Sequence, residues 1–304
     1  MKRNNTLWMA VLMVFAISLK WLVARHFGYL ERGMEGIILE VLLIPIVYVI
    51  GITITKREES SLFAALLAST IPIYNWKAGA GVTNTLTAVL FFVIVVMFLN
   101  IRKIDWRYGL PIVLLFAASS FYTLFLIPIF VIYYLLSKFE GASLTKTEKK
   151  FMFEAGFLVI LVFIFLLYGP NITLIFKQYL DTHYLSIGAG ELTLENLLSR
   201  AGSLAIVYGL LGMYSGFKNK LKPVFFLSSI MAIFTLLMFF NFFDLGYGLS
   251  YFNLSSACLA SIWYSNLEKR IKYTRLSKHK NIIKLLVIAL VIVYGSLTYL
   301  SAVR

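Results

Sequence analysis

Basic residues recur at alternate ends of a series of apolar segments, and this pattern constrains the fold more than any other feature of the chain. Twenty-one of the 28 Lys and Arg residues fall into six hydrophilic stretches. Because cytoplasmic loops of membrane proteins carry an excess of Lys and Arg, these stretches indicate a polytopic membrane protein whose N-terminus is cytoplasmic. The six stretches lie within residues 2–3, 56–57, 102–107, 138–150, 218–222 and 269–284.

The composition also indicates a chain embedded in lipid. Hydrophobic residues make up 60% of the 304 residues, well above the roughly 45–50% that is usual in soluble domains. The net charge of +14 therefore indicates a basic rim facing lipid headgroups, and we expect membrane lipids rather than nucleic acid as partners. No stretch is long and polar enough for a separate soluble domain, so residues 1–304 are expected to form a single transmembrane domain.

The lengths of the apolar segments predict an all-α, polytopic transmembrane helical bundle of about eleven membrane segments, because a spanning helix needs about 20 mostly apolar residues. The stretch 110–137 could form one long helix, which would move the basic stretch at 138–150 to the outer side. Charge parity instead favours a short hairpin that turns near Ser119 and Ser120. The expected segments are 7–23, 36–55, 61–74, 83–99, 110–119, 121–137, 151–168, 197–215, 224–241, 249–266 and 283–300.

The first apolar segment and the single cysteine are both assigned to the membrane part. No small-residue cleavage site precedes Lys20, so the first segment is expected to remain as a span rather than to be removed as a signal peptide. Cys258 is the one cysteine of the chain and lies inside an apolar run, so we expect a small buried hydrophobic side chain.

The longest connection expected on the outer side is residues 169–196. Apolar side chains recur there at helical spacing, which predicts an amphipathic helix in the membrane interface. These side chains are Ile172, Ile175, Phe176, Tyr179 and Leu180.

Ionisable and polar residues near the outer ends of the segments are the candidate functional groups. Phosphate-loop, GxSxG, HExxH and paired CxxC motifs do not occur in the sequence, so the signatures of soluble enzymes give no function. An ionisable group at membrane depth costs roughly 2.5–3.5 kcal/mol on insertion scales, and by default it marks a site or a pathway. The candidates are Glu31, Glu35 and Glu40 after the first span, the cations Lys20, Arg25, Lys77 and Arg200, and the polar residues Asn84 and Asp244.

Each candidate also has a purely structural interpretation. Glu31 and Glu35 are four residues apart and could pair with Arg25 or Arg32 at the water interface. Lys20 and Arg25 could extend to lipid headgroups, as long basic side chains near span ends commonly do.

The order of motifs from the second to the sixth span is distinctive. Lys56-Arg57-Glu58-Glu59 is followed by an Ala/Leu-rich segment that ends at Pro72, and then by the connection Lys77–Gly81. Thr83-Asn84-Thr85-Leu86 opens the next apolar segment, and Arg102-Lys103 leads to the hairpin Ala117–Pro128. This order and spacing resemble the GT-C superfamily, the multispan glycosyltransferases that use polyprenyl-phosphate or polyprenyl-diphosphate sugars. A weaker similarity covers Tyr247–Ala260 with Glu268-Lys269-Arg270.

The resemblance implies transfer of a sugar from a polyprenyl-phosphate carrier on the outer face of a membrane, here expected to be the plasma membrane of a prokaryote. In the family, a carboxylate after the first span acts as general base or metal ligand. By this resemblance Glu31 and Glu35 would be catalytic, and a divalent metal ion is the cofactor that they would hold. The residues implied in substrate binding are Arg25, Lys77, Asn84 and Arg200.

The chain departs from the family pattern at three points. Its first outer loop is short, Asn84 stands where the family has an acid, and no arginine matches the late arginine of the family. A lipid or solute transporter, a flippase and a non-catalytic subunit of a membrane complex therefore stay open as alternatives.

Overall fold

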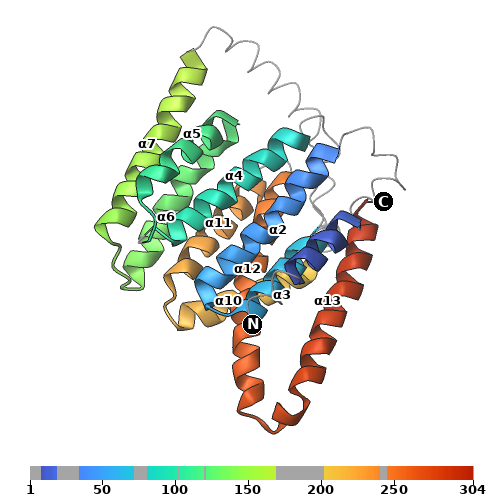
Figure 1. Ribbon diagram of the computed structural model, residues 1–304. Helices are drawn as coiled ribbons and strands as arrows, with labels where there is room; N and C mark the ends of the chain where they lie inside the picture. Colours follow the sequence, from blue (N-terminus) through green and yellow to red (C-terminus); the bar gives the residue numbers. More distant parts are fainter. Residues whose placement is uncertain are drawn as a thin grey trace.

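The computed structural model describes residues 8–18, 34–71, 81–101, 103–119, 121–168, 202–239 and 245–303. These residues form a helical bundle without strands, so the predicted all-α class is confirmed (Figure 1). Each of the predicted segments overlaps a helix of the described residues. The elements are the helix Trp8–Ser18, α2 (Met34–Thr55), α3 (Glu58–Thr70), α4 (Gly81–Leu99), η2 (Trp106–Tyr108), α5 (Gly109–Ser119), η3 (Phe121–Phe125), α6 (Leu126–Phe139), α7 (Lys146–Tyr168), α10 (Ser203–Lys218), α11 (Lys222–Phe239), α12 (Leu245–Lys272), η4 (Arg275–His279) and α13 (Lys280–Val303).

The turn from α2 to α3 shows how the local sequence sets the alternation of helices. Lys56 has a positive φ of 57°, a conformation that ends α2, and Arg57 is extended ahead of α3. Glu58 and Glu59 occupy the first turn of α3, where carboxylates favour the positive end of the helix dipole. The two helices then run antiparallel and in contact.

The chain turns back within 110–137, so the predicted hairpin is confirmed. The hydroxyl of Ser119, at the end of α5, lies 2.9 Å from that of Thr87 near the start of α4. The rings of Phe130 and Tyr133 in α6 lie 5.7 and 5.4 Å from that of Phe98 near the end of α4. The chain therefore runs beside α4 in one direction as α5 and in the opposite direction as α6.

Aromatic side chains from α4, η3, α11 and α12 form the centre of the core. The ring of Tyr251 stacks on Phe234 with centroids 4.4 Å apart, and Phe125 meets Phe234 edge-on at 4.7 Å. Phe91 packs edge-on against Tyr251 at 5.2 Å. Offset and edge-on aromatic pairs add about 0.5–1.5 kcal/mol each beyond their burial, so this cluster fixes the relative positions of four elements.

The helices α10 and α12 approach so closely that their contact excludes side chains on α10. A Cβ at Gly209 would lie 2.6 Å from the carbonyl oxygen of Ser256, and one at Gly212 would lie 2.0 Å from that of Leu259. Small residues at such contacts are the means by which membrane helices pack backbone to backbone. Within this apolar region Cys258 is fully buried, as predicted.

The basic stretches of the described residues meet at one end of the bundle. Lys222 pairs with Glu148 at 3.6 Å, which joins the stretch 218–222 to the stretch 138–150. The ammonium of Lys150 lies 4.7 Å from the centre of the Trp106 ring, which adds the stretch 102–107. Arg57 pairs with Glu268 at 3.4 Å and so adds the stretches 56–57 and 269–284.

One hydrogen bond joins helices at the basic end, and another joins helices at the opposite end. The Asn100 amide donates a hydrogen bond to the Thr53 hydroxyl at 3.1 Å, which joins the ends of α4 and α2. At the opposite end, the hydroxyls of Ser203 and Tyr294 lie 3.2 Å apart. The basic stretches of the described residues therefore share one end of the bundle, and Lys2 and Arg3 lie outside the described residues.

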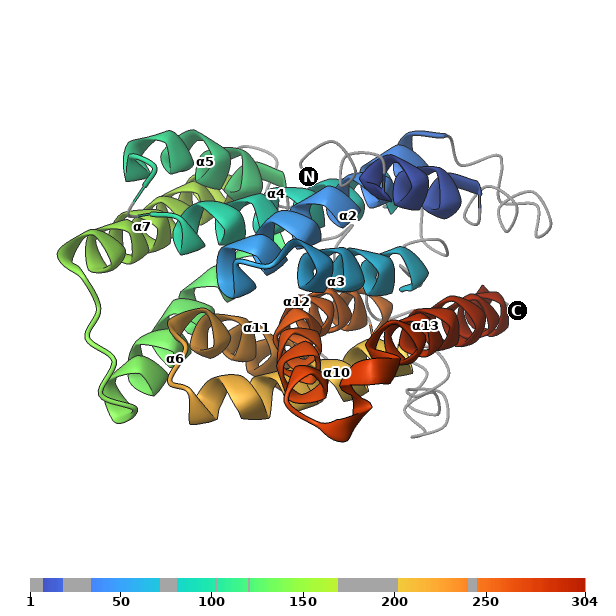
Figure 2. The same ribbon diagram turned by 60° about the horizontal axis from the view of Figure 1, so that its bottom comes forward.

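Three described stretches are both long and apolar enough to cross a membrane, judged by length and composition: Ile38–Thr55, Lys222–Phe239 and Ser277–Leu297. The helices α7 and α13 form opposite edges of the bundle, and α13 lies beside α3 (Figure 2). Thus α13 has an apolar outer face that the other described residues leave uncovered.

Candidate functional site

Most of the predicted site residues lie outside the described part of the chain. This holds for Arg25, Glu31, Lys77 and Arg200, and also for Lys20, Asp244 and the connection 169–196. Of Glu35 and Asn84 the structure describes the backbone, in the first turns of α2 and α4. Their assigned roles stay predictions.

The backbone places Glu35 and Asn84 at the same end of the bundle. The helices α2 and α4 pack together, and the hydrogen bond between Thr53 and Asn100 sets their register. Glu35 precedes Thr53 by 18 residues and Asn84 precedes Asn100 by 16 residues, which is about 27 and 24 Å along parallel helices. Both first turns therefore lie at one depth, at the end opposite to the basic stretches.

A buried carboxylate lies between these turns and the aromatic core. Glu40 is only 4% exposed and precedes Thr53 by 13 residues, as Thr87 precedes Asn100. Glu40 and Thr87 are therefore level, and Thr87 in turn contacts Ser119 at the turn of the hairpin. Because burying an ionisable group is costly, this layer is the best candidate for a functional interior on the described residues.

A second buried polar group, Asn253, comes from α12. Its side chain is fully buried, and within the part of the chain that the structure describes neither its amide nitrogen nor its amide oxygen has a hydrogen-bond partner. Leaving such a group unpaired costs about 1–3 kcal/mol, so the residue is not explained by packing. Asn253 follows Tyr251, whose ring meets Phe91 one turn below Thr87, and this places it in the same half of the bundle as Glu40.

Sequence reasoning did not single out Asn253. The signal that could have found it is an amide in the otherwise apolar and small run Tyr251–Ala260. The hydroxyl of Ser256 bonds back to the carbonyl of Phe252, and the amide of Asn100 bonds back to that of Val96 in the same way, whereas the amide of Asn253 makes no such bond within the described residues.

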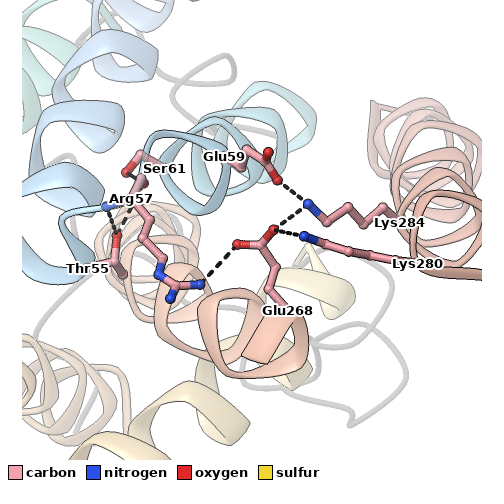
Figure 3. Close-up of polar contacts among 7 residues, drawn as sticks. All are labelled: Thr55, Arg57, Glu59, Ser61, Glu268, Lys280 and Lys284. Atoms are coloured by element: carbon pink, nitrogen blue, oxygen red, sulfur yellow. Dashed lines mark hydrogen bonds and ion pairs between the residues drawn. The ribbon is translucent and has the colours of Figure 1, made fainter. Parts of the chain in front are cut away.

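A cluster of charged side chains lies at the basic end (Figure 3). Glu268 of α12 is at its centre, with a side chain only 9% exposed. Its carboxylate pairs with Arg57 at 3.4 Å, with Lys280 at 4.0 Å and with Lys284. Lys284 also pairs with Glu59 of α3. The cluster therefore joins α13 to α12, to α3 and to the turn that precedes α3.

The electrostatics of the cluster keep Glu59 ionised. The pKa of its carboxyl is lowered from the ordinary value by hydrogen bonding with Glu268 and with Lys284, and further by the charges of Lys284 and Lys280. These effects outweigh partial burial, which acts in the opposite direction. A group held ionised in this way stabilises a structure rather than moving protons, so we interpret the cluster as a fastening for α13.

Metal-ligating side chains do not gather anywhere in the described residues: no three His, Cys, Asp or Glu side chains lie close enough to hold an ion. The carboxylate Glu31 lies outside this part of the chain. The predicted divalent metal ion is therefore a matter for experiment.

Comparison with known proteins supports the fold that the sequence suggested. No protein-family model and no curated protein matches the chain. The archaeal oligosaccharyltransferase AglB from Archaeoglobus fulgidus, in complex with an inhibitory peptide and a dolichol-phosphate, matches with a TM-score of 0.56 at 14% identity over 96% of this chain and 47% of that protein. The oligosaccharyltransferase of the same organism in its apo form gives a TM-score of 0.53 at 14% identity, with the same coverage.

The match extends along almost the whole of this chain. The chain has a GT-C-like fold. At 14% identity the likeness concerns the fold alone, and the chain spans about half the length of each archaeal protein.

Proposed function

We propose that the chain is a GT-C-type membrane glycosyltransferase that takes a sugar from a polyprenyl-phosphate carrier at the end of the bundle opposite to the basic stretches. The observation that carries the proposal is the likeness to AglB over 96% of this chain, in a structure that contains a dolichol-phosphate. We place this end on the outer face of a prokaryotic plasma membrane, because the basic stretches mark the cytoplasmic side.

Sugar transfer from the carrier requires a carboxylate and cations at the end opposite to the basic stretches. A carboxylate at Glu31 or Glu35 would orient or deprotonate the acceptor, and cations would stabilise the leaving phosphate. The arrangement of the helices supports this, because Glu35 begins α2 at the depth where Asn84 begins α4. Carboxylate and amide oxygens are also the ligands that Mg²⁺ prefers, so the proposal includes a divalent ion held by Glu31, Glu35 and Asn84.

The catalytic role of Glu31 and Glu35 can be tested by measuring sugar transfer from a polyprenyl-phosphate sugar with purified protein in lipid nanodiscs. We expect Glu31→Gln with Glu35→Gln to lower the rate by about 10²-fold or more, because a neutral amide cannot accept the proton. Glu154→Gln, which removes a carboxylate of α7 near the basic end, is the control and keeps full activity. Full activity of the double variant would remove both carboxylates from catalysis.

Binding of a polyprenyl phosphate without sugar tests the cation site separately. Arg and Lys bind phosphate oxygens strongly, so neutralising two of Arg25, Lys77 and Arg200 should weaken binding by at least about tenfold, roughly 1.4 kcal/mol. Exposed Lys146 and Lys149 at the basic end provide a control of equal charge. Equal effects of the two pairs would contradict a phosphate site at the outer end.

A protein that binds the carrier without transferring the sugar is the second candidate. Asn84 favours it, because an amide is a weaker metal ligand than the acid expected there and cannot act as a base. Binding of the carrier without transfer, together with transfer gained by Asn84→Asp, would decide for this second candidate.

A further inference from the structure

The last turn of α12 and the connection to the start of α13, residues 269–280, carry the least balanced charge of the chain. Beyond Glu268 the sequence contains no acidic residue up to its last residue. The stretches 102–107 and 138–150 contain acids of their own, and Glu148 of the second pairs with Lys222 of the stretch 218–222. We call residues 269–280 the α12–α13 tip; Figure 1 shows it as the end of the hairpin that α12 and α13 form.

Four cations of the tip are exposed and have no acidic partner among the described residues. This holds for Lys269, Arg270, Lys272 and Lys278. The nearest acid, Glu268, is already engaged by Arg57, Lys280 and Lys284. The nearby carboxylates therefore pair with the cations that hold α13 in place, and the tip keeps a concentrated positive charge.

Apolar and aromatic side chains adjoin this charge. Tyr273 at the tip is 82% exposed, and the ammonium of Lys272 lies 6.0 Å from the centre of its ring. The first turns of α13 expose Ile282, Leu285 and Leu286 to more than half of their full area. Cations beside an interfacial tyrosine and a lipid-facing apolar helix are the arrangement of a surface at the boundary between headgroups and acyl chains.

We propose that the α12–α13 tip binds the headgroups of anionic phospholipids, with their acyl chains lying along the first turns of α13. Charge complementarity favours this occupant, because basic residues beside a membrane span attract anionic lipid, and the attraction grows with each cation. The apolar face beside the cations favours a lipid over a soluble acidic protein, since Leu285 and Leu286 would contact acyl chains. The site is at the basic end and does not depend on a polyprenyl carrier.

Native mass spectrometry of the full chain, released from nanodiscs that contain equal amounts of phosphatidylglycerol and phosphatidylcholine, tests the proposal. We expect retained phosphatidylglycerol to exceed phosphatidylcholine by about tenfold. Replacing Lys269, Arg270, Lys272 and Lys278 by glutamine should abolish most of this preference, and Leu286→Gln should weaken retention of both lipids.

A control variant with the same loss of charge separates the tip from the total charge of the protein. Lys103, Lys138, Lys146 and Lys149 are exposed cations elsewhere at the basic end, and replacing them by glutamine should keep the preference. Equal loss in both variants, or no preference in the unchanged protein, would overturn the proposal. Polyprenyl-phosphate binding should be the same in the tip variant and the unchanged protein. A negative result for the binding of anionic lipid at the tip therefore does not contradict the proposed function.

Discussion

Glu268→Gln removes the carboxylate on which the fastening of α13 depends. In the folded protein this side chain is 9% exposed, and three cations converge on it: Arg57, Lys280 and Lys284. Glutamine keeps the size of the side chain but loses its charge. The cations would then face one another, with Glu59 as the remaining acid of the cluster.

The exposure of the partners sets the size of the effect. Removing one partner of a fully buried ion pair costs about 3–5 kcal/mol, whereas exposed pairs are worth about 0–1 kcal/mol. Lys284 is largely buried, but Arg57 and Lys280 are each 39% exposed, so water relieves part of the repulsion. We therefore expect a loss of about 2–3 kcal/mol, which corresponds to about 5–10 °C in midpoint temperature on the scaling of soluble domains.

Thermal unfolding of the purified protein in detergent measures this shift. Glu59→Gln is the matched control, because Glu59 belongs to the same cluster but its side chain is 62% exposed, and it should lose less than about 1 kcal/mol. Limited proteolysis at η4 gives a second measurement, since a loosened α13 lets this exposed turn unfold locally, as cleavage by a protease requires. Equal shifts for the two variants would refute the argument that burial of Glu268 sets the strength of the cluster.

Three further predictions follow from the packing, the topology and the charge cluster. Gly212→Ala should destabilise the bundle by about 1–3 kcal/mol because α10 and α12 must separate, whereas Gly156→Ala, where a Cβ meets nothing within 4 Å, should be neutral or stabilising in the same thermal assay. A cysteine placed at Ser143 in a Cys258-free protein should react with an impermeant reagent from the cytoplasmic side, and labelling from outside would reverse the assigned topology. Because the pKa of Glu59 lies below its ordinary value of 4.5, its contribution to stability should persist above that pH and disappear as the pH falls through the lowered value, which proteolysis at η4 across acidic pH can measure.

The fold was predictable because two physical signals agree. Segment length gives the number of helices, and the placement of Lys and Arg gives their direction, so even the short α5 and α6 were separated correctly. The turn at Ser119 depends on a contact with Thr87, 32 residues earlier, which no local pattern reveals. The placement of Lys and Arg revealed this turn indirectly. A single long helix would have put Lys146 and Lys149 at the end opposite to the other basic stretches.

The site was less predictable, and the reasons differ between its parts. The candidates Arg25, Lys77 and Arg200 stand on connections that the described residues do not include. The cluster around Glu268 joins residues 211 and 225 positions apart, such as Arg57 with Glu268 and Glu59 with Lys284, and pairing across such distances leaves no periodic signal. The one sign of the cluster in the sequence is that each of two basic stretches has an acid beside it: Glu59 beside 56–57 and Glu268 beside 269–284.

The fastening of α13 has a consequence for the order in which the protein is assembled. Lys284 is synthesised 225 residues after its partner Glu59, so this ion pair cannot form until the first turns of α13 have left the ribosome. Until then Glu59 and Glu268 must stay without Lys280 and Lys284 while α2 to α12 insert and pack. Closure of the cluster therefore follows the synthesis of α2 to α12, and a ribosome stalled before Lys280 would hold these helices without the ion pairs to α13.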